Sequence, residues 1–261
     1  MKAKYDVVGI DYNLTRKADP YLAIRFLALL NPSPKGLYLD IGCGTGNYTN
    51  EFQKKGFSFI GIDPSTEMLK AAKLQNEFID FRIGTSEQTD LDDVTMDGIT
   101  ISLSVHHWPD LERSFKELCR VLKEDGNMVL FTSAPEQMEG YWLNHYFPKT
   151  LQASKRQMPS IENIILAMEA GGLEITGSEY YSVKPDIHDL FLYSGKHDPE
   201  RYFNEQFRKG ISSFSDLGIV EEIESGLQQL RADIITGKVK EVMKAYENNR
   251  GDYLYITACK D

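Results

Sequence analysis

Cysteine is scarce in this sequence, and no two cysteines lie close together in it. The 261 residues include three, Cys43, Cys119 and Cys259, which lie far apart with no Cys-x-x-Cys spacing. An odd number of widely spaced cysteines is typical of a reducing compartment and argues against a disulfide framework or a thiolate zinc site. Cytoplasmic localisation is therefore the expectation.

Long apolar runs are also missing. No stretch approaches the roughly 20 apolar residues that a membrane-spanning helix needs. The first residues, Met1 to Asp6, lead into no apolar signal core. We expect a protein that is neither embedded in a membrane nor exported.

Positively charged residues are fewer than negatively charged ones. The sequence has 29 Lys and Arg residues and 39 Asp and Glu residues, which gives a net charge of -10. No basic run exceeds two residues. Nucleic-acid affinity comes mainly from clustered cations that release counterions, so a nucleic-acid partner is disfavoured. The histidines show no His-x-x-x-His spacing, and no metal site is expected.

Short apolar segments alternate with amphipathic ones from about residue 36 to 133. The pattern predicts strands at residues 37–41, 57–62, 78–83, 98–103 and 127–131, and helices at 46–55, 65–74 and 111–122. Such alternation predicts right-handed crossovers and a parallel sheet covered on both faces, a doubly wound α/β fold. Ligands in that fold lie beyond the carboxyl ends of the strands.

The remaining segments are less regular. Residues 134–159 are rich in aromatic side chains, 160–172 read as a helix, 173–183 as a strand, 185–249 as mostly helical, and 252–259 as a last strand. We expect a single domain over residues 1–261. Its core would comprise about 20–133, 160–184 and 250–261, with cap segments at about 134–159 and 185–249.

A glycine-rich turn from Asp40 to Gly46 connects a predicted strand to a predicted helix. Glycines allow the backbone to turn tightly and approach a ligand, while the helix amino terminus offers N–H donors, so a nucleotide site is predicted. The dinucleotide fingerprint needs a sixth-position glycine, where Asn47 stands, which disfavours NAD. The Asp40 carboxylate would repel a pyrophosphate but suits an ammonium group.

A second carboxylate, Asp63, ends the second predicted strand, 21 residues after Gly42. A carboxylate at this place can accept hydrogen bonds from both hydroxyls of a ribose. The alternative is that Asp63 merely neighbours a helix cap at Ser65.

Four segments in order resemble a known family: the glycine loop, Asp63, Gly84-Thr85-Ser86-Glu87, and Ser104-Val105-His106-His107-Trp108-Pro109-Asp110. Together they are similar to class I S-adenosylmethionine-dependent methyltransferases, closest to the type 11, ubiquinone-biosynthesis-like group that acts on small molecules. The resemblance covers residues 5–133 in detail. It implies a Rossmann-like sheet of seven strands whose last strand, 252–259, is antiparallel, and S-adenosyl-L-methionine as cofactor.

The resemblance also implies roles for individual residues. Those expected at the cofactor are Asp40, Gly42, Cys43 and Gly44 at the methionine part, Asp63 at the ribose, Pro64, Ser65 and Met68 beside the adenine, and Ser104. Thr85, followed by Ser86, stands where the family often has an acidic residue for the adenine amino group. Near the amino terminus, Tyr12 and Arg16 resemble a lid, with Tyr12 over the sulfonium and Arg16 at the methionine carboxylate. An ordinary surface arginine is the alternative for Arg16.

Methyl transfer is a direct in-line displacement, in which the protein chiefly aligns the two reactants. A base is needed only if the acceptor must lose a proton, and His106 is the candidate. His107, Trp142, His145 and Tyr193 are candidates for the acceptor pocket, although aromatic residues of this kind are more often core.

Four functions remain open from the sequence. The first is methyl transfer to a small-molecule acceptor, and the second is cofactor binding for regulation without catalysis. An NAD-dependent oxidoreductase is opposed by the position of Gly46, and a protein or RNA methyltransferase is opposed by the acidic charge.

Overall fold

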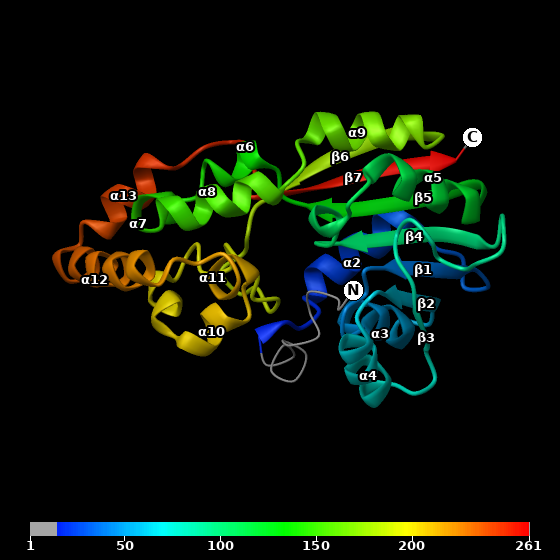
Figure 1. Cartoon of the computed structure of the whole chain (residues 1–261), viewed down its shortest axis with the longest axis horizontal. Coiled ribbons are helices and arrows are strands. Elements are labelled where there is room, and N and C mark those ends of the chain that lie inside the picture. Colours follow the sequence, from blue (N-terminus) through cyan, green and yellow to red (C-terminus); the bar gives the residue numbers. More distant parts are fainter. Residues whose placement is uncertain (1–14, 261) are drawn as a thin grey trace.

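A seven-stranded mixed sheet lies at the centre of the molecule, in a computed structural model that describes residues 15–260 (Figure 1). Its strands are β1 Leu37–Ile41, β2 Ser58–Asp63, β3 Asp80–Ile83, β4 Met96–Ser102, β5 Leu122–Thr132, β6 Leu173–Tyr181 and β7 Tyr253–Lys260. The strand order is β3-β2-β1-β4-β5-β7-β6. Strands β1 to β5 are parallel, and β7 runs antiparallel to both β5 and β6. The predicted Rossmann-like fold is confirmed.

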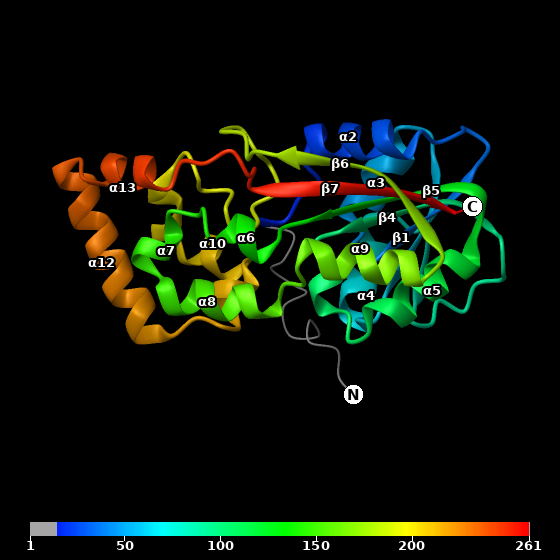
Figure 2. The ribbon, with the colours of Figure 1, turned by 90° about the horizontal axis from the view of Figure 1, so that it is seen from above.

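Helices cover both faces of this sheet, as Figure 2 shows. They are α2 Pro20–Leu30, α3 Asn47–Lys54, α4 Thr66–Gln75, α5 Leu111–Val121 and α9 Ile161–Ala170. Helix α2 packs with α3 and the aromatic side chains of one sheet face, whereas α5 and α9 share the apolar cluster of the other. The apolar stripe of α5 includes the fully buried Phe115, Leu118 and Val121, as its helical spacing predicts.

Local sequence sets where these helices begin. Ser65 accepts a hydrogen bond from the Met68 amide at 3.3 Å and caps α4 as predicted, and Asp19 caps α2 through the Leu22 amide at 3.0 Å. Such caps satisfy amides that a helix leaves unpaired in its first turn. The predicted strand starts were less accurate, because β5 begins at Leu122 rather than residue 127 and passes through Asp125 with φ of 61°.

The other helices gather beyond the carboxyl ends of the parallel strands (Figure 1). They are α6 Pro135–Met138, α7 Leu143–Tyr146, α8 Pro148–Gln157, α10 Glu205–Lys209, α11 Ser212–Ser215, α12 Val220–Thr236 and α13 Val239–Ala245, with the 3₁₀ helix η2 Pro199–Phe203. One cluster of buried side chains runs from Phe26 on α2 through Phe131 to Trp142 and Tyr202 among these helices. The predicted cap is thus packed onto the sheet by a shared apolar core.

Gly46 shows why this turn needs glycine, and a substitution tests it. The residue precedes α3 with φ of 73°, and a Cβ there would lie 2.6 Å from the ring of Phe81. We expect Gly46→Ala to lower the free energy of unfolding by about 2 to 4 kcal/mol, through left-handed strain and overpacking. Urea denaturation measures this. Gly237→Ala is the control, because its φ is 81° but a Cβ would contact nothing within 4 Å; equal losses would contradict the packing argument.

Candidate active site

Three adjoining cavities lie where the parallel strands end. The Asp63 cavity, of about 400 Å³, is lined by residues that follow β1, β2, β3 and β4. The Asp40 cavity, of about 60 Å³, shares Gly42 with it. The Tyr141 cavity, of about 100 Å³, lies against the cap helices and shares Arg16 with the Asp40 cavity. The three cavities therefore neighbour one another between the sheet edge and the cap, with Gly42 and Arg16 each lining two of them.

Asp63 lies at the end of β2 and is 8% exposed. One carboxylate oxygen accepts a hydrogen bond from the Gly44 amide at 2.9 Å, and the other accepts one from the Ser65 amide at 2.9 Å. The carboxylate therefore fixes the glycine loop relative to α4 while lining the Asp63 cavity. Of the residues predicted for the cofactor, this cavity also brings together Gly42, Pro64, Ser65, Thr85, Ser86 and Ser104.

Gly42 is required by a close approach between two loops. Its φ is 71°, and a Cβ would lie 2.5 Å from the Cβ of Ser104. The Ser104 hydroxyl donates to the Ile41 carbonyl at 3.3 Å. The end of β4 therefore packs directly on the glycine loop, which no larger residue would allow.

Two findings change the predicted adenine side. Met68, on α4, is 2% exposed and does not line the Asp63 cavity. Glu87 does line the cavity, next to Thr85 and Ser86. The position predicted for an acidic residue holds Thr85, and the carboxylate that lines the cavity comes two residues later along the chain.

Asp40 is buried in the Asp40 cavity at 2% exposure. Its carboxylate accepts hydrogen bonds from the Thr49 hydroxyl at 2.6 Å and the Thr100 hydroxyl at 3.3 Å. Burial raises the pKa of Asp40 to about 6, the two hydroxyls oppose this, and the nearby Asp63 charge adds to it. The group is thus mostly ionised at neutral pH, and it takes up a proton as the pH falls through about 6.

This pKa predicts a pH-dependent affinity for a ligand with an ammonium group. Such a ligand favours the ionised carboxylate, so binding weakens as the pH falls through about 6 and Asp40 takes up a proton. We expect the affinity for S-adenosylhomocysteine to fall by about tenfold between pH 7.5 and pH 5. Titration calorimetry at several pH values measures this. Asp40→Asn should flatten the profile, and an equal slope in that variant would contradict the assignment.

Gly44 and Cys43, both predicted at the methionine part, line the same cavity. A Cβ on Gly44 would meet nothing within 4 Å, so the loop leaves open space at that point. Burial, with Asp63 and Asp40 nearby, raises the pKa of the Cys43 thiol well above its usual value. Cys43 therefore stays protonated and is unsuited to act as a nucleophile.

Arg16 lines both the Asp40 and the Tyr141 cavities. Its Nε donates to Asp189 at 2.5 Å and its Nη2 donates to the same carboxylate at 3.3 Å. The guanidinium therefore lies at the cavities, and its two-point partner is a carboxylate from the cap, Asp189. Tyr12 lies outside the described residues.

The neighbouring His106 and His107 face different cavities. They belong to the 3₁₀ helix η1 Val105–His107 after β4, and their ring centroids are 3.9 Å apart. His106 lines the Tyr141 cavity, whereas His107 lines the Asp63 cavity. Leu103, with φ of 50°, turns the chain at this point. Left-handed backbone in a leucine is strained and is typical of functional sites.

Of the four residues predicted for the acceptor pocket, His107 lines the Asp63 cavity and the other three line none of the three cavities. Trp142 and Tyr193 are buried, and the Trp142 amide donates to the Tyr193 hydroxyl at 3.2 Å, so both belong to the core of the cap. His145 contacts Gln229 at 3.1 Å near the surface. The wall of the Tyr141 cavity is formed instead by Tyr141, Phe191 and Tyr253.

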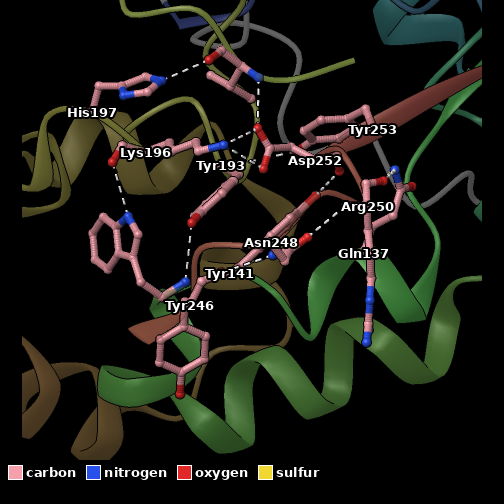
Figure 3. A network of polar contacts seen from close by, with 12 residues as sticks. Gln137, Tyr141, Tyr193, Lys196, His197, Tyr246, Asn248, Arg250, Asp252 and Tyr253 are labelled. Atoms are coloured by element: carbon pink, nitrogen blue, oxygen red, sulfur yellow. Dashed lines mark hydrogen bonds and ion pairs between the residues drawn. The ribbon is translucent and has the colours of Figure 1, made fainter. Parts of the chain in front are cut away.

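A polar network holds this aromatic wall (Figure 3). Tyr141 stacks on Tyr193 at 3.9 Å, and its hydroxyl donates to the Asp252 carbonyl. The Asp252 carboxylate pairs with Lys196 at 2.8 Å. Burial raises the pKa of the Tyr141 and Tyr253 hydroxyls, so both stay protonated. The wall therefore presents neutral rings to the cavity.

Within residues 15–260, no group of three or more His, Cys, Asp or Glu side chains is arranged to hold a metal ion. No helix in the described part of the chain is long and apolar enough to cross a bilayer.

Comparison with known proteins agrees with this site. A model of the methyltransferase domain matches residues 39–130, from the glycine loop to β5. An uncharacterized methyltransferase of Mycobacterium tuberculosis is 29% identical over 130 residues, which cover 50% of this chain and 52% of the relative. The human mitochondrial ubiquinone biosynthesis O-methyltransferase is 29% identical over 152 residues, covering 52% and 41%. The chain thus spans about half the length of the curated relatives it matches.

One solved structure extends the similarity over nearly the whole chain. It is a candidate methyltransferase from an antibiotic biosynthesis pathway of Anabaena variabilis, 30% identical with a TM-score of 0.82, and the match covers 93% of this chain and 98% of that one. The match therefore includes the cap as well as the sheet. The chain belongs to the class I S-adenosylmethionine-dependent methyltransferases, in the type 11 group.

Proposed function

We propose that this protein binds S-adenosylmethionine across the Asp63 and Asp40 cavities and transfers its methyl group to a small molecule in the Tyr141 cavity. The observation that carries the proposal is the set of three neighbouring cavities, in which Gly42 lines the first two and Arg16 the last two. A nucleoside, an amino-acid group and an acceptor each correspond to one cavity in that order.

The residues present fit the cofactor. Asp63 would accept from the ribose hydroxyls and Glu87 from the adenine amino group, and Trp108 and Pro109 add apolar surface to the same cavity. In the Asp40 cavity the Asp40 carboxylate suits the ammonium group and the Arg16 guanidinium suits the carboxylate. The open space at Gly44 leaves room beside the loop.

The chemistry asks little of the protein beyond alignment. S-adenosylmethionine, when bound, supplies an activated methyl group on its sulfonium. Leu103 and His106 bring the acceptor cavity to the end of β4, beside the cofactor cavities. His106, which lines the Tyr141 cavity, would take the proton of an acceptor hydroxyl as a general base.

The same cavity favours a small, mainly apolar acceptor over a protein or RNA. Its described lining includes nine apolar or aromatic side chains. The lining also includes one charged side chain, that of Arg16, which is paired with Asp189. The lining residues are Arg16, Leu103, His106, Ser133, Met138, Tyr141, Ser154, Gln157, Met158, Phe191, Leu192, Ile211, Ser212, Ser213, Leu217 and Tyr253.

The continuous apolar core supports one domain that includes the cap. The cysteine pattern keeps the cytoplasm as the proposed location.

A methyl-transfer assay tests the proposal. The purified protein is incubated with S-adenosylmethionine carrying a tritiated methyl group and a panel of phenols, hydroxyquinones, amines and thiols. We expect labelled product from at least one hydroxylated aromatic compound. Cofactor binding without labelled product from any member of a broad panel would favour the alternative, a regulatory protein that binds S-adenosylmethionine or S-adenosylhomocysteine without catalysis.

A further inference from the structure

We infer that Asp189 is a positioning residue for the amino-acid part of the cofactor, and that through it cofactor binding shapes the acceptor cavity. The inference rests on the proposed function. Asp189 belongs to neither the glycine loop nor the sheet, since it comes from the irregular segment between β6 and η2.

Asp189 is buried at 2% exposure, at the wall of the Asp40 cavity. Its carboxylate accepts two hydrogen bonds from Arg16 and a third from the Tyr48 hydroxyl at 3.2 Å. Tyr48 lies on α3, directly after the glycine loop. Asp189 therefore holds the Arg16 guanidinium beside the loop, in an ion pair that is largely removed from water.

The charges around this cavity match a zwitterion. Asp40 and Asp189 contribute two carboxylates, while Arg16 and Lys17 contribute two cations, around a space of about 60 Å³. A phosphate group would meet both carboxylates in so small a space and be repelled. An α-amino acid group, with an ammonium and a carboxylate close together, can meet an opposite charge at each end.

The same segment also forms part of the acceptor cavity. Phe191 and Leu192 line the Tyr141 cavity, only two and three residues after Asp189. The Leu190 amide donates to the Thr15 carbonyl at 3.1 Å, next to Arg16. A ligand that fixes the Arg16 and Asp189 pair therefore also fixes the backbone that carries this wall. Binding of the amino-acid part should therefore favour acceptor binding.

The first test compares two ligands that differ only in the amino-acid part. S-adenosylhomocysteine has it, whereas 5′-methylthioadenosine retains the nucleoside and sulfur without it. We expect Asp189→Asn to weaken binding of S-adenosylhomocysteine at least tenfold, measured by calorimetry, and to leave binding of 5′-methylthioadenosine within twofold. Asp198→Asn is the matched control, because its side chain is 53% exposed on the same segment, and it should change neither affinity.

Other outcomes are equally informative. Equal losses for both ligands, or no loss for either, would overturn the inference while leaving the proposed function standing. If neither ligand binds the wild-type protein, the proposed function fails and the inference fails with it. Tyr48→Phe guards against misfolding of Asp189→Asn, since it removes one contact to the carboxylate and keeps the ion pair. It should show a loss of about twofold to threefold, confined to S-adenosylhomocysteine.

Amide hydrogen exchange tests the link to the acceptor cavity. In the wild-type protein, S-adenosylhomocysteine should slow exchange in residues 188–192, and 5′-methylthioadenosine should not. Asp189→Asn should lose this protection, and Asp189→Glu, which restores the charge, should recover part of it. Equal protection of the segment by both ligands would contradict the proposed coupling.

Discussion

Asp63→Ala is expected to weaken binding of S-adenosylhomocysteine by at least a hundredfold. Two hydrogen bonds from the ribose hydroxyls to a carboxylate are lost, each contributing about 1.5 to 3 kcal/mol. The Asp63 carboxylate also accepts from the Gly44 and Ser65 amides, so the loop that meets the ligand loses its anchor. A hundredfold change corresponds to about 2.7 kcal/mol, within reach of the ribose contacts alone.

The control for this variant is Asp80→Ala. Asp80 begins the neighbouring strand β3, and its side chain is 51% exposed and paired with Arg82, so its removal should leave the affinity unchanged. Asp63→Asn is a second variant, because an amide oxygen still accepts one hydrogen bond, and we expect an intermediate loss. Wild-type affinity in Asp63→Ala, with the protein folded by circular dichroism, would show that the ribose is placed wrongly.

His106→Ala is expected to lower kcat by about a hundredfold with little change in the Kd of the cofactor. General acid and base groups typically contribute 10²-fold to 10⁴-fold to a rate. His106 lines the Tyr141 cavity and not the Asp63 cavity, which is why the loss should fall on turnover. The measurement uses an acceptor found with the tritium assay and S-adenosylmethionine at saturation.

The matched control is the adjacent residue. His107 lines the Asp63 cavity, so His107→Ala should weaken cofactor binding and change kcat much less. Comparing these two variants distinguishes the roles of the two cavities, because the substituted residues are adjacent in the chain. Normal turnover in His106→Ala with its best acceptor would mean that His106 only shapes the loop and that no base is needed.

Much of the sheet and the cofactor side could be predicted from sequence because their signals are local. Alternating apolar segments gave β1, β2 and β3 to within two residues, and the glycines of the loop need positive φ at 42, 44 and 46. Asp63 follows β2 directly, so its place at the sheet edge results from strand order alone. The family membership rests on the match to the methyltransferase domain model and on the similarity to the Anabaena variabilis structure.

The acceptor side could not be predicted in the same way. Trp142 and Tyr193 are as aromatic as Tyr141 and Phe191, and only packing decides which of them face the cavity. Asp189 stands in a segment without helical or strand periodicity, far along the chain from the Arg16 and Tyr48 that it contacts. Contacts between residues so distant in sequence leave no local pattern.

The most direct test of the account is calorimetric titration of the ligand-stripped protein with S-adenosylmethionine, S-adenosylhomocysteine and NADH. We predict micromolar Kd values for the first two ligands and no binding of NADH, since Asp40 faces the loop where a pyrophosphate would lie. Binding of NADH alone, or of none of the three, would contradict the account.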